Sequence, residues 1–141
     1  MKPASAKAKG RKLQQYVRDS ILEVFNKELT SDDVRSTSMG AAGEDLQLST
    51  KARTLLQSAF ECKSRRRIAV YRDYEQAQEH ASKTKAAEPV VVIKENGKDP
   101  LALISLDWFL KMCYDSSKYR EFYREQHREE SKQATLLKGK E

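Results

Sequence analysis

The chain has few cysteines and histidines, and none of them is clustered. Cys62 and Cys113 have neither the spacing of a metal-binding motif nor the density of a secreted disulfide scaffold. His80 and His127 are equally isolated, with no Cys or His partner at zinc spacing, so we assign them no chemistry. The sequence therefore argues against a structural zinc site and favours a reducing, intracellular setting, either cytoplasm or nucleoid.

Long apolar runs are also missing. No uninterrupted run approaches the ~20 residues that a membrane helix needs. The start of the chain carries lysines but no apolar stretch of signal-peptide length, and the sequence contains no internal repeat. We therefore expect a soluble protein with no membrane partner.

The composition fits one domain with a modest core. The chain has 141 residues, of which 38% are hydrophobic, and a second domain is not expected. It contains 27 Lys and Arg against 21 Asp and Glu, a formal charge of +6. This excess of positive charge favours a polyanionic partner such as nucleic acid.

Three parts of the chain differ in composition. Residues 1–11 are rich in Ala, Lys, Ser, Pro and Gly, with almost nothing to bury, and predict a flexible basic arm. Residues 12–116 contain the apolar patterns of a folded domain. Residues 117–141 are highly charged, with Arg120, Arg124 and Arg128 at helical spacing among glutamates, which predicts an exposed, salt-bridged helix and a frayed tail.

Helical and strand patterns alternate within the domain, which indicates an α/β fold. Leu13, Val17 and Ile21 recur at helical spacing and predict a helix over residues 12–27. A hairpin is predicted around Asn96-Gly97. The remaining expected elements are strands over 34–38, 58–64, 90–93 and 101–104, helices over 49–56 and 73–85 and from 107 onward, and a loop over 40–43.

The predicted strand 58–64 places chemical groups on one face. Side chains alternate along a strand, so Glu61 and Lys63 share one face while Phe60 and Cys62 share the other. With Asp45 alongside, the first face offers two carboxylates for a divalent cation and an ammonium for a developing anion or an attacking water. This arrangement predicts metal-dependent hydrolysis of a phosphodiester. The alternative is an exposed strand pair with no chemistry.

Three segments together resemble the PD-(D/E)XK nuclease superfamily: Gly43-Glu44-Asp45, Glu61-Cys62-Lys63-Ser64 and Tyr74-Glu75-Gln76-Ala77. With Lys9-Gly10-Arg11 before the first helix, the chain is similar in particular to archaeal-type Holliday-junction resolvases. The resemblance covers roughly Lys9 to Phe109. It implies a restriction-endonuclease-like central mixed β-sheet flanked by helices, Mg²⁺- or Mn²⁺-dependent endonuclease activity on DNA, and a homodimer.

The resemblance also assigns roles to particular residues. It makes Asp45 and Glu61 metal ligands, the Cys62 carbonyl a third ligand, and Lys63 the catalytic lysine. Gln76 matches a helix glutamine that helps to place substrate or water. For Gln76 there is an alternative, because Asp73 and Gln76 also have the spacing of a helix-capping pair.

Two positions depart from the family pattern. Glu44 stands where these nucleases have proline, so either Glu44 or Asp45 could bind the metal, and Asp45 is the better match. Gln14 stands where resolvases of this type carry an acid on the first helix, within its apolar arc. We expect Gln14 to be either a neutral ligand or a group that hydrogen-bonds a metal-bound water, or else an amide at the edge of the core that is bonded to backbone.

Basic and hydroxyl residues near these segments are candidates for contacts with the DNA backbone. The arginines that follow the strand 58–64 would lie beside the scissile phosphate, although a solvated charge run and ordinary turn chemistry are the alternatives. The candidates are Lys9, Arg11, Arg35, Ser36, Ser38, Arg65, Arg66 and Arg67.

The residues predict metal-dependent hydrolysis of a phosphodiester, and the resemblance implies an endonuclease that acts on branched DNA, with four-way junctions as the expected substrate. Two other functions stay open. One is a general, nicking or restriction-like nuclease, and the other is a DNA-binding protein that keeps the fold without the activity.

Overall fold

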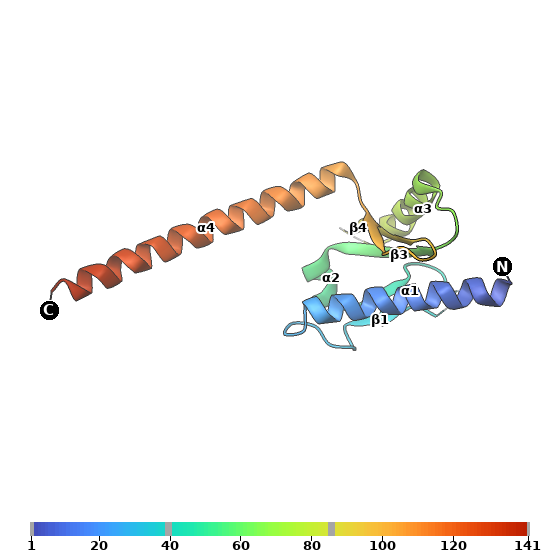
Figure 1. Cartoon of the computed structure of the whole chain (residues 1–141), viewed down its shortest axis with the longest axis horizontal. Coiled ribbons are helices and arrows are strands. Elements are labelled where there is room, and N and C mark those ends of the chain that lie inside the picture. The colour runs from blue at the N-terminus through green and yellow to red at the C-terminus, as the bar shows by residue number, and fades with distance from the viewer. Residues whose placement is uncertain (1, 39–40, 85–86, 141) are drawn as a thin grey trace. The chain divides into compact units, whose positions relative to one another are not determined.

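The computed structural model describes residues 2–38, 41–84 and 87–140, which form a mixed α/β structure of four helices and two small sheets (Figure 1). The chain divides into two compact units, one up to Ile104 and one from Ser105 onward. No helix in the described ranges is both long enough and apolar enough to cross a membrane.

A three-stranded mixed sheet forms the centre of the first unit. β3 (Ser58–Ser64) pairs in parallel with β4 (Glu88–Lys94), and β4 pairs antiparallel with β5 (Leu101–Leu103). The β-branched run of β4 lies in the middle of this sheet with Val90 to Val92 buried, as the near-continuous apolar pattern predicts. The predicted Asn96-Gly97 turn joins β4 to β5, with Gly97 at φ 71°.

A second, two-stranded sheet is formed by β1 (Val34–Ser36) and β2 (Leu46–Leu48), which pair antiparallel. The amide of Asp45, just before β2, donates to the Phe60 carbonyl on the edge of β3 at 3.0 Å. This bond brings the residue before β2 to the open edge of the central sheet. Gly43 in the preceding loop has φ 100°, and Gly40 of the predicted loop lies outside the described residues.

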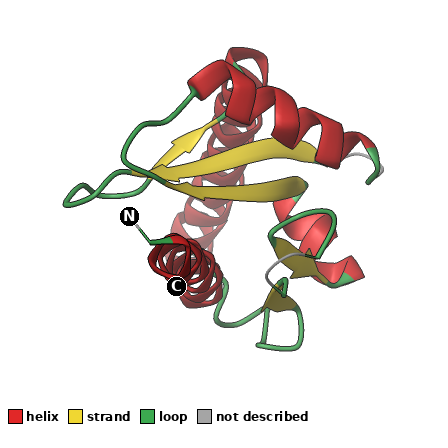
Figure 2. Cartoon of the chain, turned by 90° about the vertical axis from the view of Figure 1, so that its right-hand side faces the viewer, coloured by secondary structure: helices red, strands yellow, loops and turns green. Residues whose placement is uncertain are grey.

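Helices cover both faces of the central sheet (Figure 2). α1 (Pro3–Val24) packs on the face that carries Phe60 and Cys62, where its buried leucine and valine side chains join Val90 and Val92 in the main core. α3 (Val70–Ser82) packs on the opposite face and is the crossover between the parallel strands β3 and β4. The short helix α2 (Thr50–Leu56) is capped by Ser49, whose hydroxyl accepts from the Ala52 amide.

The prediction of a flexible arm over residues 1–11 is wrong, because α1 begins at Pro3. Proline is favoured in the first turn of a helix, where its missing N–H costs nothing, and the alanines and lysines that follow have high helix propensity. The helix therefore starts ten residues before the first buried position, Leu13, and its first two turns are largely exposed.

Three further boundaries differ from the sequence prediction. α3 begins at Val70, after an N-cap at Ala69, so Asp73 is inside the helix and its amide donates to the Ala69 carbonyl. α4 (Leu106–Lys138) is one continuous helix where a frayed tail was expected, and the compact unit ends at Ile104 where a domain to 116 was expected. Neither proline nor glycine interrupts α4, and Ser105 caps its start.

Candidate active site

Glu61 and Lys63 lie side by side on the face of β3 that α3 covers, as predicted. Their side chains form an ion pair, with Lys63 Nζ 3.0 Å from Glu61 Oε1. Both residues are buried, at 5% and 8% exposure. A buried pair of this kind needs further polar partners, because desolvation of each charge is costly. The alternative of an exposed strand pair is therefore wrong.

α3 supplies those partners from two residues one turn apart. Lys63 Nζ donates to Gln76 Oε1 at 2.8 Å, and His80 Nδ1 lies 2.9 Å from Glu61 Oε2. Both oxygens of Glu61 are therefore bonded, one to Lys63 and one to His80. His80 is not among the site residues predicted from the sequence. Its spacing of four residues from Gln76 places both on the same face of a helix, and this was the signal that could have revealed it.

Asp45 lies at the open edge of β3. Its Oδ2 accepts a hydrogen bond from the Cys62 amide at 2.6 Å. Because the N–H and C=O of one residue point to the same side of a strand, the Cys62 carbonyl also faces this edge, away from β4. The structure thus brings the Asp45 carboxylate close to the Cys62 carbonyl. Cys62 directly follows Glu61, whose carboxylate lies on the α3 side of β3.

The site disfavours negative charge in the absence of a cation. Burial raises the pKa of Asp45, and the nearby charge of Glu61 raises it further, while the Cys62 N–H, Lys63 and His80 act in the opposite direction. Burial also raises the pKa of the Cys62 thiol, so this side chain stays neutral and the residue can contribute only its carbonyl.

The donor set fits a hard divalent cation that keeps part of its water. Within the described ranges, no three His, Cys, Asp or Glu side chains form a metal-binding group. Mg²⁺, however, commonly binds through one or two carboxylates and retains several waters. Asp45, Glu61 and the Cys62 carbonyl would hold such an ion, and its charge would relieve the unfavourable burial of the Asp45 carboxylate.

We predict that His80→Ala weakens metal binding by about 10- to 100-fold, because it removes the group that fixes Glu61 Oε2. His80→Asn should largely restore binding, since its amide nitrogen can take the place of Nδ1. Titration calorimetry with Mn²⁺ measures the affinity, and Glu79→Ala at the neighbouring exposed position is the control. Equal affinities for the Ala and Asn variants would contradict this role.

Glu44, the second acid considered for the metal, is engaged elsewhere. Its carboxylate accepts two hydrogen bonds from Arg53, at 3.0 and 2.9 Å, and a third from Thr84 at 2.9 Å. Arg53 also donates to the Ser58 carbonyl at 2.6 Å. Glu44 therefore ties the loop before β2 to α2 and the start of β3, and Asp45 is the acid available to a metal.

Glu44→Gln should consequently destabilise the fold by about 2 kcal/mol, the range for a hydrogen-bonded charged group. Chemical denaturation measures this loss, with the exposed Glu28→Gln as control. Metal affinity of the folded protein should not change. A normal stability with impaired metal binding would instead make Glu44 the ligand.

Gln14 is buried on α1, at 5% exposure, and its Oε1 has no hydrogen-bond partner. One alternative predicted for Gln14 was an amide at the edge of the core that is bonded to backbone. Its side-chain oxygen makes no such bond. An orphaned acceptor is costly and calls for an unseen donor such as water. Gln14 does not hydrogen-bond to Asp45 or Glu61, so it is not part of the bonded network described above.

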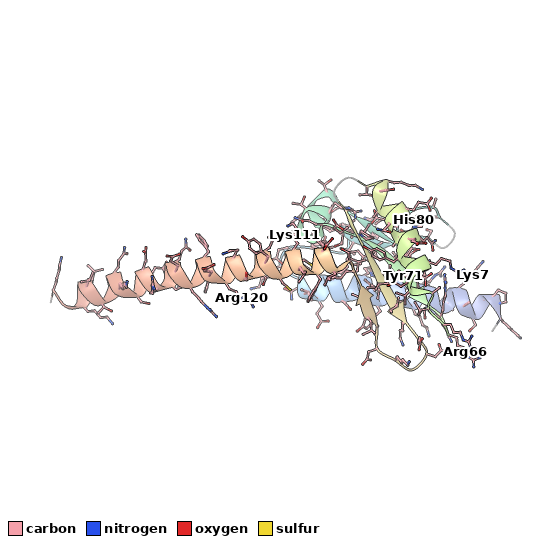
Figure 3. All side chains as sticks on the ribbon, turned by 90° about the horizontal axis from the view of Figure 1, so that it is seen from above. Lys7, Arg66, Tyr71, His80, Lys111 and Arg120 are labelled. Atoms are coloured by element: carbon pink, nitrogen blue, oxygen red, sulfur yellow. The ribbon has the colours of Figure 1, made fainter. Side chains whose placement is uncertain are left out.

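The capping interpretation of Gln76 is wrong, because Asp73 does not cap α3. Asp73 is almost fully buried and forms an ion pair with Arg65 at 3.2 Å, while its Oδ2 has no hydrogen-bond partner. The Arg65 guanidinium is therefore engaged in an ion pair with Asp73. Arg66 and Arg67 are exposed in the loop after β3, and Figure 3 shows Arg66 reaching outward.

The other candidate DNA contacts are spread over the first unit. Lys9 bonds to Asn96 at 2.9 Å, Arg35 pairs with Asp32 at 2.9 Å, and Arg11 and Ser38 are exposed. The Ser36 hydroxyl is buried without a hydrogen-bond partner. Ser36 is therefore poorly placed for a phosphate, whereas Arg11 and Ser38 are accessible.

No residue of α4 is buried, and all of them except Trp108 are exposed, as predicted for the charged part of the helix. Its ion pairs within the described chain join Lys111 to Asp115, Lys118 to Glu121 and His127 to Glu130. The expected salt bridges of Arg120, Arg124 and Arg128 are absent there, and Arg120 extends from the helix in Figure 3.

No family model, no curated protein and no solved structure matches this chain.

Proposed function

We propose that this protein is a metal-dependent DNA endonuclease that hydrolyses phosphodiester bonds in branched DNA. The observation that carries the proposal is the convergence of Asp45, Glu61 and Lys63 at the edge of β3, with Gln76 bonded to the lysine. The mixed sheet between α1 and α3 supports a restriction-endonuclease-like fold for it.

Each residue would contribute separately to the reaction. A Mg²⁺ or Mn²⁺ ion held by Asp45, Glu61 and the Cys62 carbonyl would supply Lewis acidity and lower the pKa of a bound water. The Lys63 ammonium would stabilise the negative charge that develops on the phosphate. Gln76 fixes the direction of this ammonium, and His80 fixes the orientation of Glu61. Preorganised charge of this kind is worth most in a buried site.

The substrate and the assembly follow from charge and from the need to cut two strands. A net charge of +6, with Arg66 and Arg67 exposed beside the end of β3, suits the DNA backbone. Symmetric resolution of a four-way junction requires two sites, which a homodimer would supply. Such an enzyme would work inside the cell, where chromosomal DNA is found.

The proposal is tested by incubating the full chain with a labelled four-way junction, linear duplex and single strand, in Mg²⁺ or in EDTA. Metal-dependent, symmetric nicking of the junction alone would support junction resolution, and cutting of all three would indicate a general or nicking nuclease. Binding without cleavage in Mg²⁺ and in Mn²⁺ would leave an inactive DNA-binding protein.

A further inference from the structure

A cleft outside the candidate active site lies between the first half of α1 and the turn that joins β4 to β5. It has a volume of about 430 Å³, and its walls include Lys9 and Lys12 of the helix and residues 94–100 of the turn. The Lys9 ammonium donates to the Asn96 side chain at 2.9 Å, across 87 residues of sequence, and so joins the two walls. The cleft is therefore built by long-range contacts.

The cleft is lined by apolar and aromatic side chains as well as by basic ones. Leu13, Tyr16 and Pro100 line it, and Tyr16 is 57% exposed, so its ring is open to a ligand. Tyr16, Pro100 and the apolar side chains of Ile21 and Leu101 also border an adjoining apolar groove. An aromatic ring and apolar walls accept the flat face of an unsaturated ring better than they accept a charged group.

The lysines of the cleft outnumber its acids. Lys9, Lys12, Lys94 and Lys98 line it, together with the acids Glu95 and Asp99. Glu95 forms an ion pair with Lys98 at 2.8 Å. The Lys94 ammonium donates to the backbone carbonyl of Lys98 at 2.7 Å. This acceptor is neutral, so the positive charge of Lys94 is not balanced by it. The cleft therefore offers positive charge next to an aromatic ring.

The cleft adjoins the candidate active site through β3. Ser64, the last residue of this strand, lines the cleft, and it follows Lys63 directly. Side chains alternate along a strand, so Ser64 faces the α1 side while Lys63 faces α3. A nucleic acid strand at Lys63 can therefore reach the cleft by passing around the end of β3.

We propose that this cleft binds a single-stranded segment of DNA, with an unpaired base against Tyr16 and its phosphates at Lys12 and Lys94. Grooves that combine positive charge with an aromatic platform suit single strands, because every base offers a π face. A base in a duplex is enclosed between its neighbours and cannot reach Tyr16. This inference rests on the proposed function and adds branched DNA with an unpaired segment to its expected substrates.

The test measures binding of the full chain in EDTA, where metal-dependent cleavage does not interfere. Fluorescence anisotropy is recorded with a labelled 20-nucleotide thymidine strand and with a duplex of equal length. Tyr16→Ala should weaken single-strand binding about tenfold, the usual loss when the aromatic side chain under one stacked base is removed. It should leave duplex binding unchanged. Tyr16→Phe should bind like the wild type. Tyr71→Ala is the control, because Tyr71 is 84% exposed and lies on α3, away from the cleft.

The lysines are tested by the salt dependence of the same binding. Lys12→Ala should lower the slope of log affinity against log salt by about 0.7, the value for one phosphate contact on a single strand. Lys27→Ala, an exposed lysine beyond the end of α1, should not change it.

Equal losses for single strand and duplex, or none for either, would overturn the cleft proposal while leaving the endonuclease proposal intact. A wild-type protein that does not bind the single strand would also overturn the cleft proposal, and the endonuclease proposal would still be decided by cleavage of the four-way junction. Thermal melting of the Tyr16 variants should match the wild type, since this side chain is exposed.

Discussion

Replacing Lys63 with glutamine should reduce the rate of DNA cleavage by about 100- to 1,000-fold, the cost of removing one group that stabilises transition-state charge. Glutamine keeps a donor within reach of Glu61 and Gln76, the two partners of the lysine, but it carries no positive charge. The expected loss is therefore in the chemical step. Single-turnover cleavage at saturating protein measures it.

A matched control is Lys51→Gln, an exposed lysine on α2. Both variants should bind DNA as the wild type does. Because Lys63 neutralises a buried carboxylate, its removal also carries a risk to stability. Thermal melting is therefore measured in parallel. A Lys63→Gln protein that folds and cuts at the normal rate would show that this lysine is not catalytic.

Asp45→Asn should abolish measurable metal binding and cleavage. The loss of metal affinity should exceed the roughly 100-fold loss expected when a residue that only hydrogen-bonds a ligand is removed. The asparagine oxygen can still accept from the Cys62 amide, so the fold around β3 should persist. Calorimetry with Mn²⁺ and the cleavage assay measure the two losses. Asp107→Asn at an exposed position of α4 should change neither.

The same substitution should preserve or increase stability at neutral pH. The pKa of Asp45 in the folded protein is raised above its ordinary value of 3.8, so the fold favours the protonated form. The charged carboxylate therefore costs stability above that raised pKa, and a neutral amide removes the cost. A Tm that falls sharply in Asp45→Asn would contradict this account and indicate a structural role for the carboxylate.

Much of the fold could be predicted from local patterns. The strand predicted over residues 58–64 has the bounds of β3, and the valine run with an Asn-Gly turn predicted the β4–β5 hairpin. The start of α1 was missed because the prediction relied on apolar periodicity, whereas alanine, lysine and a first-turn proline extend a helix with nothing to bury.

The candidate site was only partly predictable. Glu61 and Lys63 could be placed on one face because strand geometry is local. The roles of His80 and Glu44 depend on contacts with residues 19 and 9 positions away, respectively. Such contacts are set by how α3 and α2 pack, and a single sequence does not contain that information. The same limit explains Asp73, whose spacing suggested a helix cap while the fold pairs it with Arg65.

The central claim is that Asp45, Glu61 and Lys63 form a metal-dependent hydrolytic site. It is tested most directly by the single-turnover rate of cleavage of a labelled four-way junction in Mg²⁺, in EDTA, and with Lys63→Gln in Mg²⁺. The account predicts nicked product only for the wild type in Mg²⁺, and at most about 1% of that rate for the variant. Product that forms equally in EDTA, or equally with the variant, would contradict it.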